Sequence, residues 1–148
     1  MNQGPLIREL NHTYKEMDDF YHQYANDIGL SFSAFLIYYG ISLLGEGCLQ
    51  KDICELVFIS KQTINSSIRN LEQEGCLSLV HGHGRELHIH LTEKGKQISD
   101  TKVLPIVQWE QEALMKMTPE ERRLLVSLTR TYLDHLKQNS LSETEEQK

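Results

Sequence analysis

Apolar and aromatic residues recur at helical spacing near both ends of this chain. Between residues 5 and 28 they follow one another at steps of three or four, which predicts an amphipathic helix with a seam close to a heptad repeat. They are Leu6, Leu10, Tyr14, Met17, Tyr21, Tyr24 and Ile28. A second stripe runs through Leu125, Leu128, Tyr132 and Leu136. One small lobe has too little surface to cover both stripes, so we expect a second copy of the chain to pack against them.

Start and stop signals divide the chain into further elements. Ser31 and Ser60 are placed to cap helices, because a serine hydroxyl accepts the free amide hydrogens of a first helical turn. Thr118-Pro119-Glu120-Glu121 predicts another helix start, with a threonine cap and a glutamate in the capping-box place. The expected order is helices over 5–28, 32–44, about 50–57 and 60–74, strands over 77–81 and 87–91, a helix over 92–117 interrupted at Pro105, and a last helix from 119. This order predicts a mainly α protein with one small β-hairpin.

Length and composition restrict the class of protein. The 148 residues suffice for a single domain. No apolar run approaches the ~18 residues of a membrane span, and the N-terminal segment lacks the basic and apolar regions of a secretory signal. The cysteines, Cys48, Cys54 and Cys76, are odd in number and lack CxxC spacing, which favours a reducing compartment. We therefore expect a cytoplasmic protein without a membrane partner.

The net charge of −6 is unevenly distributed along the chain. Residues 50–96 carry six basic and six acidic side chains, whereas the segments before and after them are both acidic. A polyanion is therefore repelled least by the middle of the chain, which permits a phosphate-facing surface there.

Residues 50–75 have the pattern of two helices joined by a short turn. Ile53 and Cys54 lie on the expected inner face of the first helix, and Ile64 and Ile68 lie on that of the second. Two helices with so short a connection cross steeply, which is typical of a helix-turn-helix.

The outward face of the second of these helices carries the candidate chemistry. Its residues are polar or basic and none is acidic: Ser60 as the cap, then Lys61, Gln62, Thr63, Asn65, Ser66 and Arg69. Gln, Asn and Arg make bidentate contacts with purine edges in the major groove, and Lys, Ser and Thr suit phosphates. The cap aims the free amides and the positive end of the helix dipole outward. We interpret this face as a DNA-recognition surface, because an ordinary solvated helix face more often mixes glutamate with lysine.

Several segments match one known pattern: QKDICEL from residue 50, SKQTINSSIRNLEQEG from residue 60, the two-stranded wing, and HLTEKG from residue 90. In these segments the chain resembles the MarR family of winged-helix transcriptional regulators. The resemblance is specific from about residue 50 to 95 and extends in helix order over nearly the whole chain. It implies a winged helix-turn-helix lobe at about 30–95, with N- and C-terminal dimerisation helices at about 1–29 and 96–138. We expect the polar tail at 139–148 to be disordered.

The resemblance also implies a function. Members of the family are homodimers that bind double-stranded DNA, with a recognition helix from each subunit in successive major grooves and a wing arginine in the minor groove. Arg85 occupies that wing position here. The implied protein is a repressor that binds a pseudo-palindromic operator, is released by a small-molecule effector and needs no cofactor.

Two residues depart from the family's pattern. His83 stands where the wing usually has an aspartate two residues before its arginine, which leaves open how Arg85 is oriented. Phe58 stands in the turn between the two motif helices, where Gly or Asn is frequent. We expect its ring to be tucked into the core.

The wing holds four of the seven histidines, in the stretch HGHGRELHIH from residue 81. Strand alternation places His88 and His90 on a shared solvent face. Two His-x-His pairs suit Zn²⁺ or Ni²⁺, but no cysteine or aspartate completes a tetrahedral set, and Glu86 is a partial ligand at best. We therefore expect no metal, and a metal-responsive regulator is an alternative interpretation.

Aromatic residues of the outer and second helices are candidates for the effector site. In the family these helices frame a crevice for small aromatic effectors, and the candidates here are His12, Tyr38, Tyr39 and Trp109. Aromatic stripes at helical spacing are also usual in a dimer core. No motif such as GxSxG or HExxH occurs, so we do not expect an enzyme. A winged-helix protein-interaction module without DNA function is a further alternative.

Overall fold

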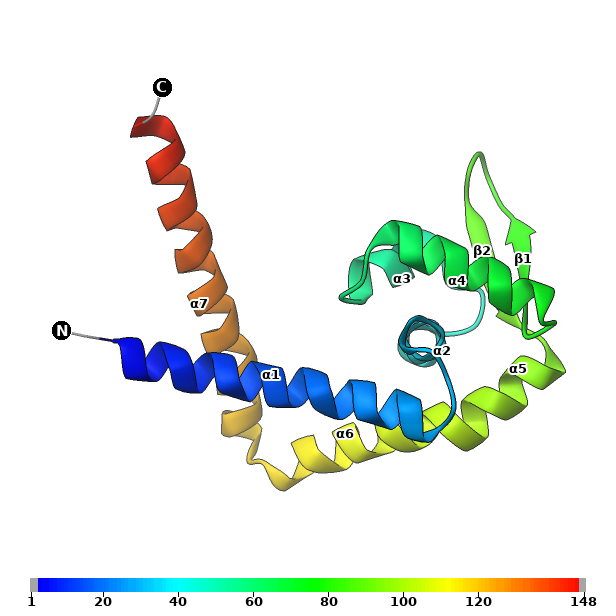
Figure 1. Ribbon diagram of the computed structural model, residues 1–148, viewed down its shortest axis with the longest axis horizontal. Helices are drawn as coiled ribbons and strands as arrows, with labels where there is room; N and C mark the ends of the chain where they lie inside the picture. Colours follow the sequence, from blue (N-terminus) through cyan, green and yellow to red (C-terminus); the bar gives the residue numbers. More distant parts are fainter. Residues whose placement is uncertain (1–2, 147–148) are drawn as a thin grey trace. The chain divides into compact units, whose positions relative to one another are not determined.

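Helices make up most of the computed structural model, in which residues 3–146 are described (Figure 1). The elements are α1 (Gly4–Asp27), α2 (Phe32–Leu44), α3 (Gln50–Leu56), α4 (Lys61–Gln73), β1 (Leu77–His81), β2 (Leu87–Leu91), α5 (Glu93–Ile98), a π-helix (Ser99–Val103), α6 (Leu104–Lys116) and α7 (Pro119–Glu146). The predicted fold class, mainly α with one hairpin wing, is confirmed. Internal contacts divide the chain into two compact units, one ending at residue 107 and the other beginning at residue 108.

The core of the first unit is built around α2, which Figure 1 views end-on among α1, α3, α4 and α5. The buried residues of α2 are Ala34, Phe35, Leu36, Ile37, Tyr38, Gly40 and Ile41. Gly40 allows α3 to approach closely, because a Cβ at this position would lie 3.3 Å from Cγ2 of Ile53. The helix is therefore apolar on nearly all sides, as expected for one surrounded by other elements.

The wing is an antiparallel hairpin in which Leu79 pairs with Ile89. The loop between α2 and α3 adds to its second strand: Gly47 N donates to Ile89 O at 2.8 Å, and Ile89 N donates to Cys48 O at 2.9 Å. As a result β2 is hydrogen-bonded along both edges, by β1 and by this loop.

The predicted helix starts are confirmed by their side-chain caps. Ser31 Oγ accepts from the amide of Ala34 at 3.2 Å. Ser60 Oγ likewise accepts from the amide of Thr63 at 3.2 Å. The capping box of α7 is reciprocal, because Thr118 N donates to Glu121 Oε2 at 2.8 Å and Glu121 N donates to Thr118 Oγ1 at 3.2 Å.

The helical segment after the wing is interrupted one turn earlier than predicted. The sequence predicts a break at Pro105, whereas the structure has a π-helix over Ser99–Val103 and Pro105 lies in the first turn of α6. Proline has no amide hydrogen to donate to the carbonyl four residues before it. That carbonyl belongs to residue 101, so the irregular hydrogen bonding falls in the turn before the proline.

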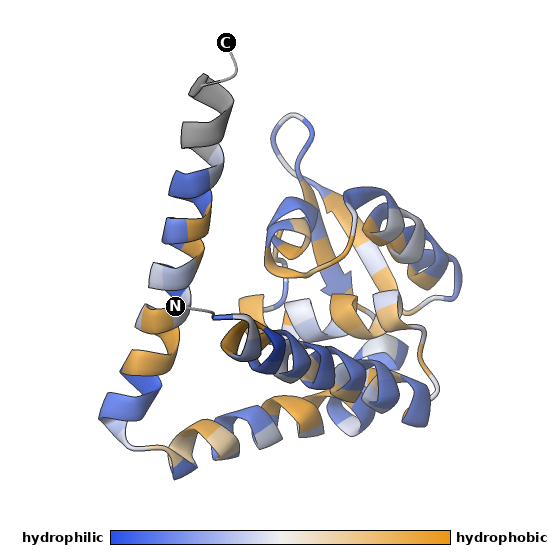
Figure 2. Ribbon diagram, turned by 60° about the vertical axis from the view of Figure 1, so that its left-hand side comes forward, coloured by the Kyte–Doolittle hydropathy of each residue, from blue (hydrophilic) through white to orange (hydrophobic). Residues whose placement is uncertain are grey.

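The second unit contains the long helix α7, along which hydrophobic segments recur (Figure 2). Its large apolar side chains are exposed: Leu124, Leu125, Val126, Leu128, Tyr132, Leu133 and Leu136. The sequence predicts a disordered tail over 139–148, but α7 continues through Glu146, because no proline or glycine interrupts that stretch. Residues 147–148 lie outside the described part of the chain.

Large apolar side chains are also exposed on α1, namely Leu6, Ile7, Tyr14, Met17 and Phe20. Within the described residues, no single helix is both long and apolar enough to cross a membrane. The pair α1 and α2 meets that criterion only when joined, and it is bent by 99° at the break.

Candidate nucleic-acid interface

The helices α3 and α4 place one polar surface outward because their apolar faces are buried against the core. Ile53 of α3 is 0% exposed, and Ile64 and Ile68 of α4 are 0% and 1% exposed. Both helices contact α2. The polar side chains of α4 therefore face away from the lobe, as the sequence predicts.

The structure exposes most of the residues predicted to contact DNA. Lys61, Gln62, Thr63, Ser66 and Arg69 are exposed along α4, together with Ser60 at its start. The hydroxyl of Ser60 caps the helix and lies 2.8 Å from Thr63 Oγ1, so the hydroxyl is already engaged within the helix. A ligand at this position would instead meet the exposed N-terminal end of α4. No acidic residue occurs on α4 before Glu72.

Asn65 differs from its neighbours because it is half-buried. Its Oδ1 accepts a hydrogen bond from Nε2 of Gln50, the first residue of α3. Gln50 is not among the residues that the sequence predicts to contact DNA. Its place at the start of a helix in the QKDICEL segment was the available signal, but no spacing rule links it to Asn65.

Arg85 is exposed in the wing, directly after Gly84, whose φ of +62° turns the chain. Within residues 3–146 no hydrogen bond or ion pair of the Arg85 guanidinium is found. The residue in the expected aspartate position, His83, uses its main-chain oxygen to accept from Glu86 N at 3.2 Å. Main-chain contacts therefore form this turn, and no carboxylate orients the arginine.

His88 and His90 lie on the same face of β2, opposite the buried Ile89, but both are half-buried and have partners. His88 Nδ1 lies 2.8 Å from Gly47 O, and its Nε2 lies 3.7 Å from Glu86 Oε2. His90 Nδ1 lies 3.6 Å from a carboxylate oxygen of Glu46, which also accepts the amide of Leu91 at 3.1 Å. The reason is that the α2–α3 loop covers the outer edge of β2. In the described part of the chain, no group of three or more His, Cys, Asp or Glu side chains is arranged to hold a metal ion.

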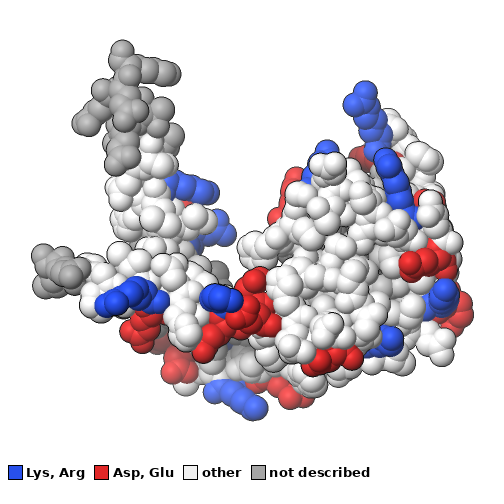
Figure 3. Space-filling model, in the orientation of Figure 1, with Lys and Arg blue, Asp and Glu red and all other residues white. Residues whose placement is uncertain are grey.

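A groove of about 300 Å³ lies between α3, the start of α4 and the wing. Its lining residues are Leu49, Gln50, Lys51, Cys54, Lys61, Asn65, Arg85, Glu86 and Leu87. Three of them are cations and one is an acid. Figure 3 shows long Lys and Arg side chains projecting at the top of the lobe, the end at which Figure 1 draws the wing tip. The groove therefore joins α4 to the wing in one predominantly basic surface.

Two side chains of α3 and of the turn that follows it are more exposed than predicted. Cys54 lines the groove and is only half-buried. Burial raises the pKa of its thiol, and the nearby Lys61 ammonium opposes that rise. Phe58 is 100% exposed, so the prediction that its ring is tucked into the core is wrong. The short α3–α4 turn projects from the lobe, and Val57 and Ile59 on either side of Phe58 take the inward positions.

Comparison with known proteins shows what this arrangement resembles. No family model matches the chain. A protein of Bacillus subtilis described as an uncharacterized HTH-type transcriptional regulator is 31% identical over 109 residues, which cover 72% of this chain and 63% of that protein. A MarR family regulator from Neisseria meningitidis superposes with a TM-score of 0.74 at 20% identity, over 97% of this chain and 99% of that one. The chain has the MarR fold. The resemblance expected from the sequence is thereby confirmed.

A second solved structure with the MarR fold is a complex with DNA. It contains the Staphylococcus aureus regulator MepR, which superposes with a TM-score of 0.60 at 20% identity. The match covers 92% of this chain and 98% of MepR. Matches at 20% identity establish the fold only. The roles of individual residues rest on the geometry described above.

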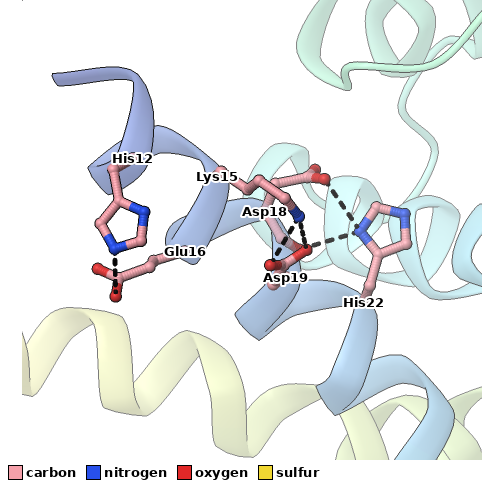
Figure 4. Close-up of polar contacts among 6 residues, drawn as sticks. All are labelled: His12, Lys15, Glu16, Asp18, Asp19 and His22. Atoms are coloured by element: carbon pink, nitrogen blue, oxygen red, sulfur yellow. Dashed lines mark hydrogen bonds and ion pairs between the residues drawn. The ribbon is translucent and has the colours of Figure 1, made fainter. Parts of the chain in front are cut away.

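The four candidates for an effector site lie on three helices, His12 on α1, Tyr38 and Tyr39 on α2, and Trp109 on α6. Tyr38 is 0% exposed, and burial raises the pKa of its phenol. Tyr39 is half-buried and its ring packs near that of Phe35, with centroids 5.8 Å apart. His12 is exposed on α1 and lies 3.3 Å from Glu16 (Figure 4). Trp109 is exposed and belongs to the second unit.

The polar face of α1 carries pairs at a spacing of four residues (Figure 4). Lys15 Nζ bonds to Asp19 at 2.9 Å, and this contact raises the pKa of the lysine. His22 Nδ1 lies 2.9 Å from Asp18 O, and its ring stacks on Phe32 at a centroid distance of 3.6 Å. These pairs are local to the helix surface and form no ligand-binding cluster.

Proposed function

We propose that this protein is a sequence-specific DNA-binding transcriptional regulator that acts in the cytoplasm as a homodimeric repressor. The observation that carries the proposal is the exposed face of α4, which has no acidic residue before Glu72 in its last turn and lies beside a wing whose arginine has no partner in the described chain. A phosphate-facing surface needs uncompensated cations, and a base-reading surface needs exposed amides and guanidinium groups. Both are present on this one side of the lobe.

In the proposed complex, α4 enters the major groove with its N-terminal end leading. Lys61, Thr63 and Ser66 contact phosphates, and the helix end at Ser60 adds its dipole. Gln62, Asn65 and Arg69 face base edges. Arg85 reaches the adjacent minor groove, where a narrow groove attracts a guanidinium.

The proposed homodimer is supported by exposed apolar side chains on two long helices. Leu6, Ile7 and Met17 of α1 and Val126 and Leu128 of α7 are each more than half exposed. Such patches on a single chain usually mark a protein interface. A twofold dimer reads a pseudo-palindromic operator with half-sites about one helical turn apart, roughly 34 Å.

The comparisons support the same proposal. MepR, which shares the fold, has been solved bound to DNA. The B. subtilis relative is described as a transcriptional regulator, although the matched segment covers 63% of its length. A small aromatic molecule is proposed as the effector, because half-buried rings such as Tyr39 and Tyr21 offer stacking surfaces near the outer helix.

The experiment that tests the proposal is a selection of bound duplexes from random DNA, followed by titration at several salt concentrations. A regulator enriches one pseudo-palindromic sequence, and its affinity falls steeply as salt rises. Arg69→Ala should weaken binding and relax the preference at one base pair per half-site if Arg69 reads a base. Arg8→Ala, on α1, is the matched control and should leave binding unchanged.

Two other results would point to the alternatives. A protein that enriches no sequence and binds duplex DNA at no salt concentration is better described as an interaction module. Stoichiometric zinc or nickel in the purified, untagged protein, lost in His83→Ala and His88→Ala variants, would support a metal-responsive regulator.

A further inference from the structure

Among the predicted recognition residues, all of which the structure describes, only Asn65 hydrogen-bonds to a different helix. Its partner is Gln50, which lies fifteen residues earlier in the chain and begins α3. Both side chains are half-buried and line the groove between α3, α4 and the wing. The contact therefore spans the two helices of the motif.

The contact limits what Asn65 can offer to a ligand. An asparagine reads adenine by using both ends of its amide, with the oxygen accepting from N6 and the nitrogen donating to N7. In the structure the bond from Gln50 occupies one of the two lone pairs of the Asn65 amide oxygen and holds the plane of that amide toward α3. What is limited is the direction of the amide, and this limit holds whichever way the two amides are flipped, because an oxygen of one then still bonds to the nitrogen of the other.

The surroundings keep Gln50 in place. Leu49 immediately before it bridges to His88 of β2, so the start of α3 is attached to the wing strand. Ile53, one turn later on α3, is 0% exposed and fixes the helix against α2. The backbone of Gln50 is thus held on one side by the bridge of Leu49 to the wing and on the other by the packing of Ile53 against α2.

We infer that Gln50 is a positioning residue that restrains Asn65 and so decides which base Asn65 can read. The inference rests on the proposed function and deepens it, because it assigns a determinant of specificity outside the recognition helix. With Gln50 present, Asn65 makes a single contact and discriminates weakly at its base pair. Without Gln50, the amide of Asn65 is free to make the bidentate adenine contact.

The test is a comparison of base preference by selection from random duplexes. Gln50→Met keeps the length of the side chain and removes its amide, and Gln50→Ala is the second variant should the first fold poorly. Each is expected to gain a preference for adenine of roughly tenfold at one position per half-site. Gln73→Ala, an exposed glutamine at the end of α4, is the matched control and should keep the wild-type profile.

The double variant Gln50→Met with Asn65→Ala separates positioning from direct contact. The adenine preference should disappear in the double variant, because the side chain that reads the base is gone. Asn65→Ala alone should change the wild-type profile little. Circular dichroism and urea unfolding of each variant verify that the fold is retained.

Three outcomes would overturn the inference while the wild type still binds its selected duplex. In the first, the Gln50 variants keep the wild-type base profile. In the second, they lose affinity equally for all sequences, as expected for a phosphate contact. In the third, their changed profile persists after Asn65 is removed. A wild-type protein that selects no duplex instead overturns the proposed function, and the two failures are therefore distinguishable.

Discussion

His88 Nδ1 lies 2.8 Å from the main-chain oxygen of Gly47, and this contact ties the second strand of the wing to the loop between α2 and α3. The same loop forms main-chain hydrogen bonds with Ile89 on both its amide and its carbonyl. The base of the wing is consequently held on two sides, whereas Arg85 nearer the tip is exposed. Such an arrangement presents an exposed charged side chain from a firmly attached hairpin.

Replacing His88 by alanine should lower the free energy of unfolding by about 1 kcal/mol, because the half-buried Gly47 carbonyl loses its side-chain partner. Urea denaturation at neutral pH measures the change. His83→Ala is the matched control, since that exposed side chain in the same hairpin should cost less than about 0.5 kcal/mol. Equal losses for the two variants would argue against the attachment.

Replacing Gly95 by alanine should destabilise the protein by about 1–3 kcal/mol or more. A Cβ at this position in α5 would lie 1.9 Å from the main-chain oxygen of Cys76, so the helix and the start of the wing would have to separate. In an exposed helix the same substitution normally stabilises by up to about 1 kcal/mol. Thermal or urea unfolding gives the sign of the change in the free energy of unfolding. A more stable variant would contradict the close approach of Gly95 to Cys76. The neighbouring Lys96→Ala serves as a control on an exposed position.

Replacing Phe58 by serine should leave the free energy of unfolding unchanged within about 0.5 kcal/mol, because the ring is fully exposed and contributes nothing to the core. Phe35→Ala, by contrast, removes a 0% exposed ring and should cost about 3–5 kcal/mol. The two variants are compared by urea unfolding. A loss of more than about 2 kcal/mol for Phe58→Ser would restore the expectation of a buried ring.

Replacing Arg85 by alanine should weaken DNA binding and reduce the slope of log affinity against log salt by about one. The physical reason is the loss of one cation that displaces counterions from the duplex. Fluorescence anisotropy at four or more salt concentrations measures both quantities, and Arg8→Ala on α1 is the control. An unchanged slope would remove Arg85 from the interface.

Local rules account for what the sequence predicted well. Ser31, Ser60 and Thr118 start their helices because a hydroxyl can accept from an amide within three residues. The strands begin and end where the apolar alternation does, at Leu77–His81 and Leu87–Leu91. The helix is interrupted about one turn before Pro105, where the sequence places the break, because a proline removes a hydrogen bond to the carbonyl four residues before it.

The sequence by itself determined the elements, the polar face of α4 with no acidic residue before Glu72, and the position of Arg85 in the wing, since each follows from residues within a few positions of one another. Only the tertiary structure decided that Asn65 is engaged by Gln50, that His88 is held by Gly47 and that Phe58 is left outside. The first two contacts join residues separated by 15 and 41 positions. Contacts across such distances depend on how helices and strands pack, and no periodicity along the chain encodes them.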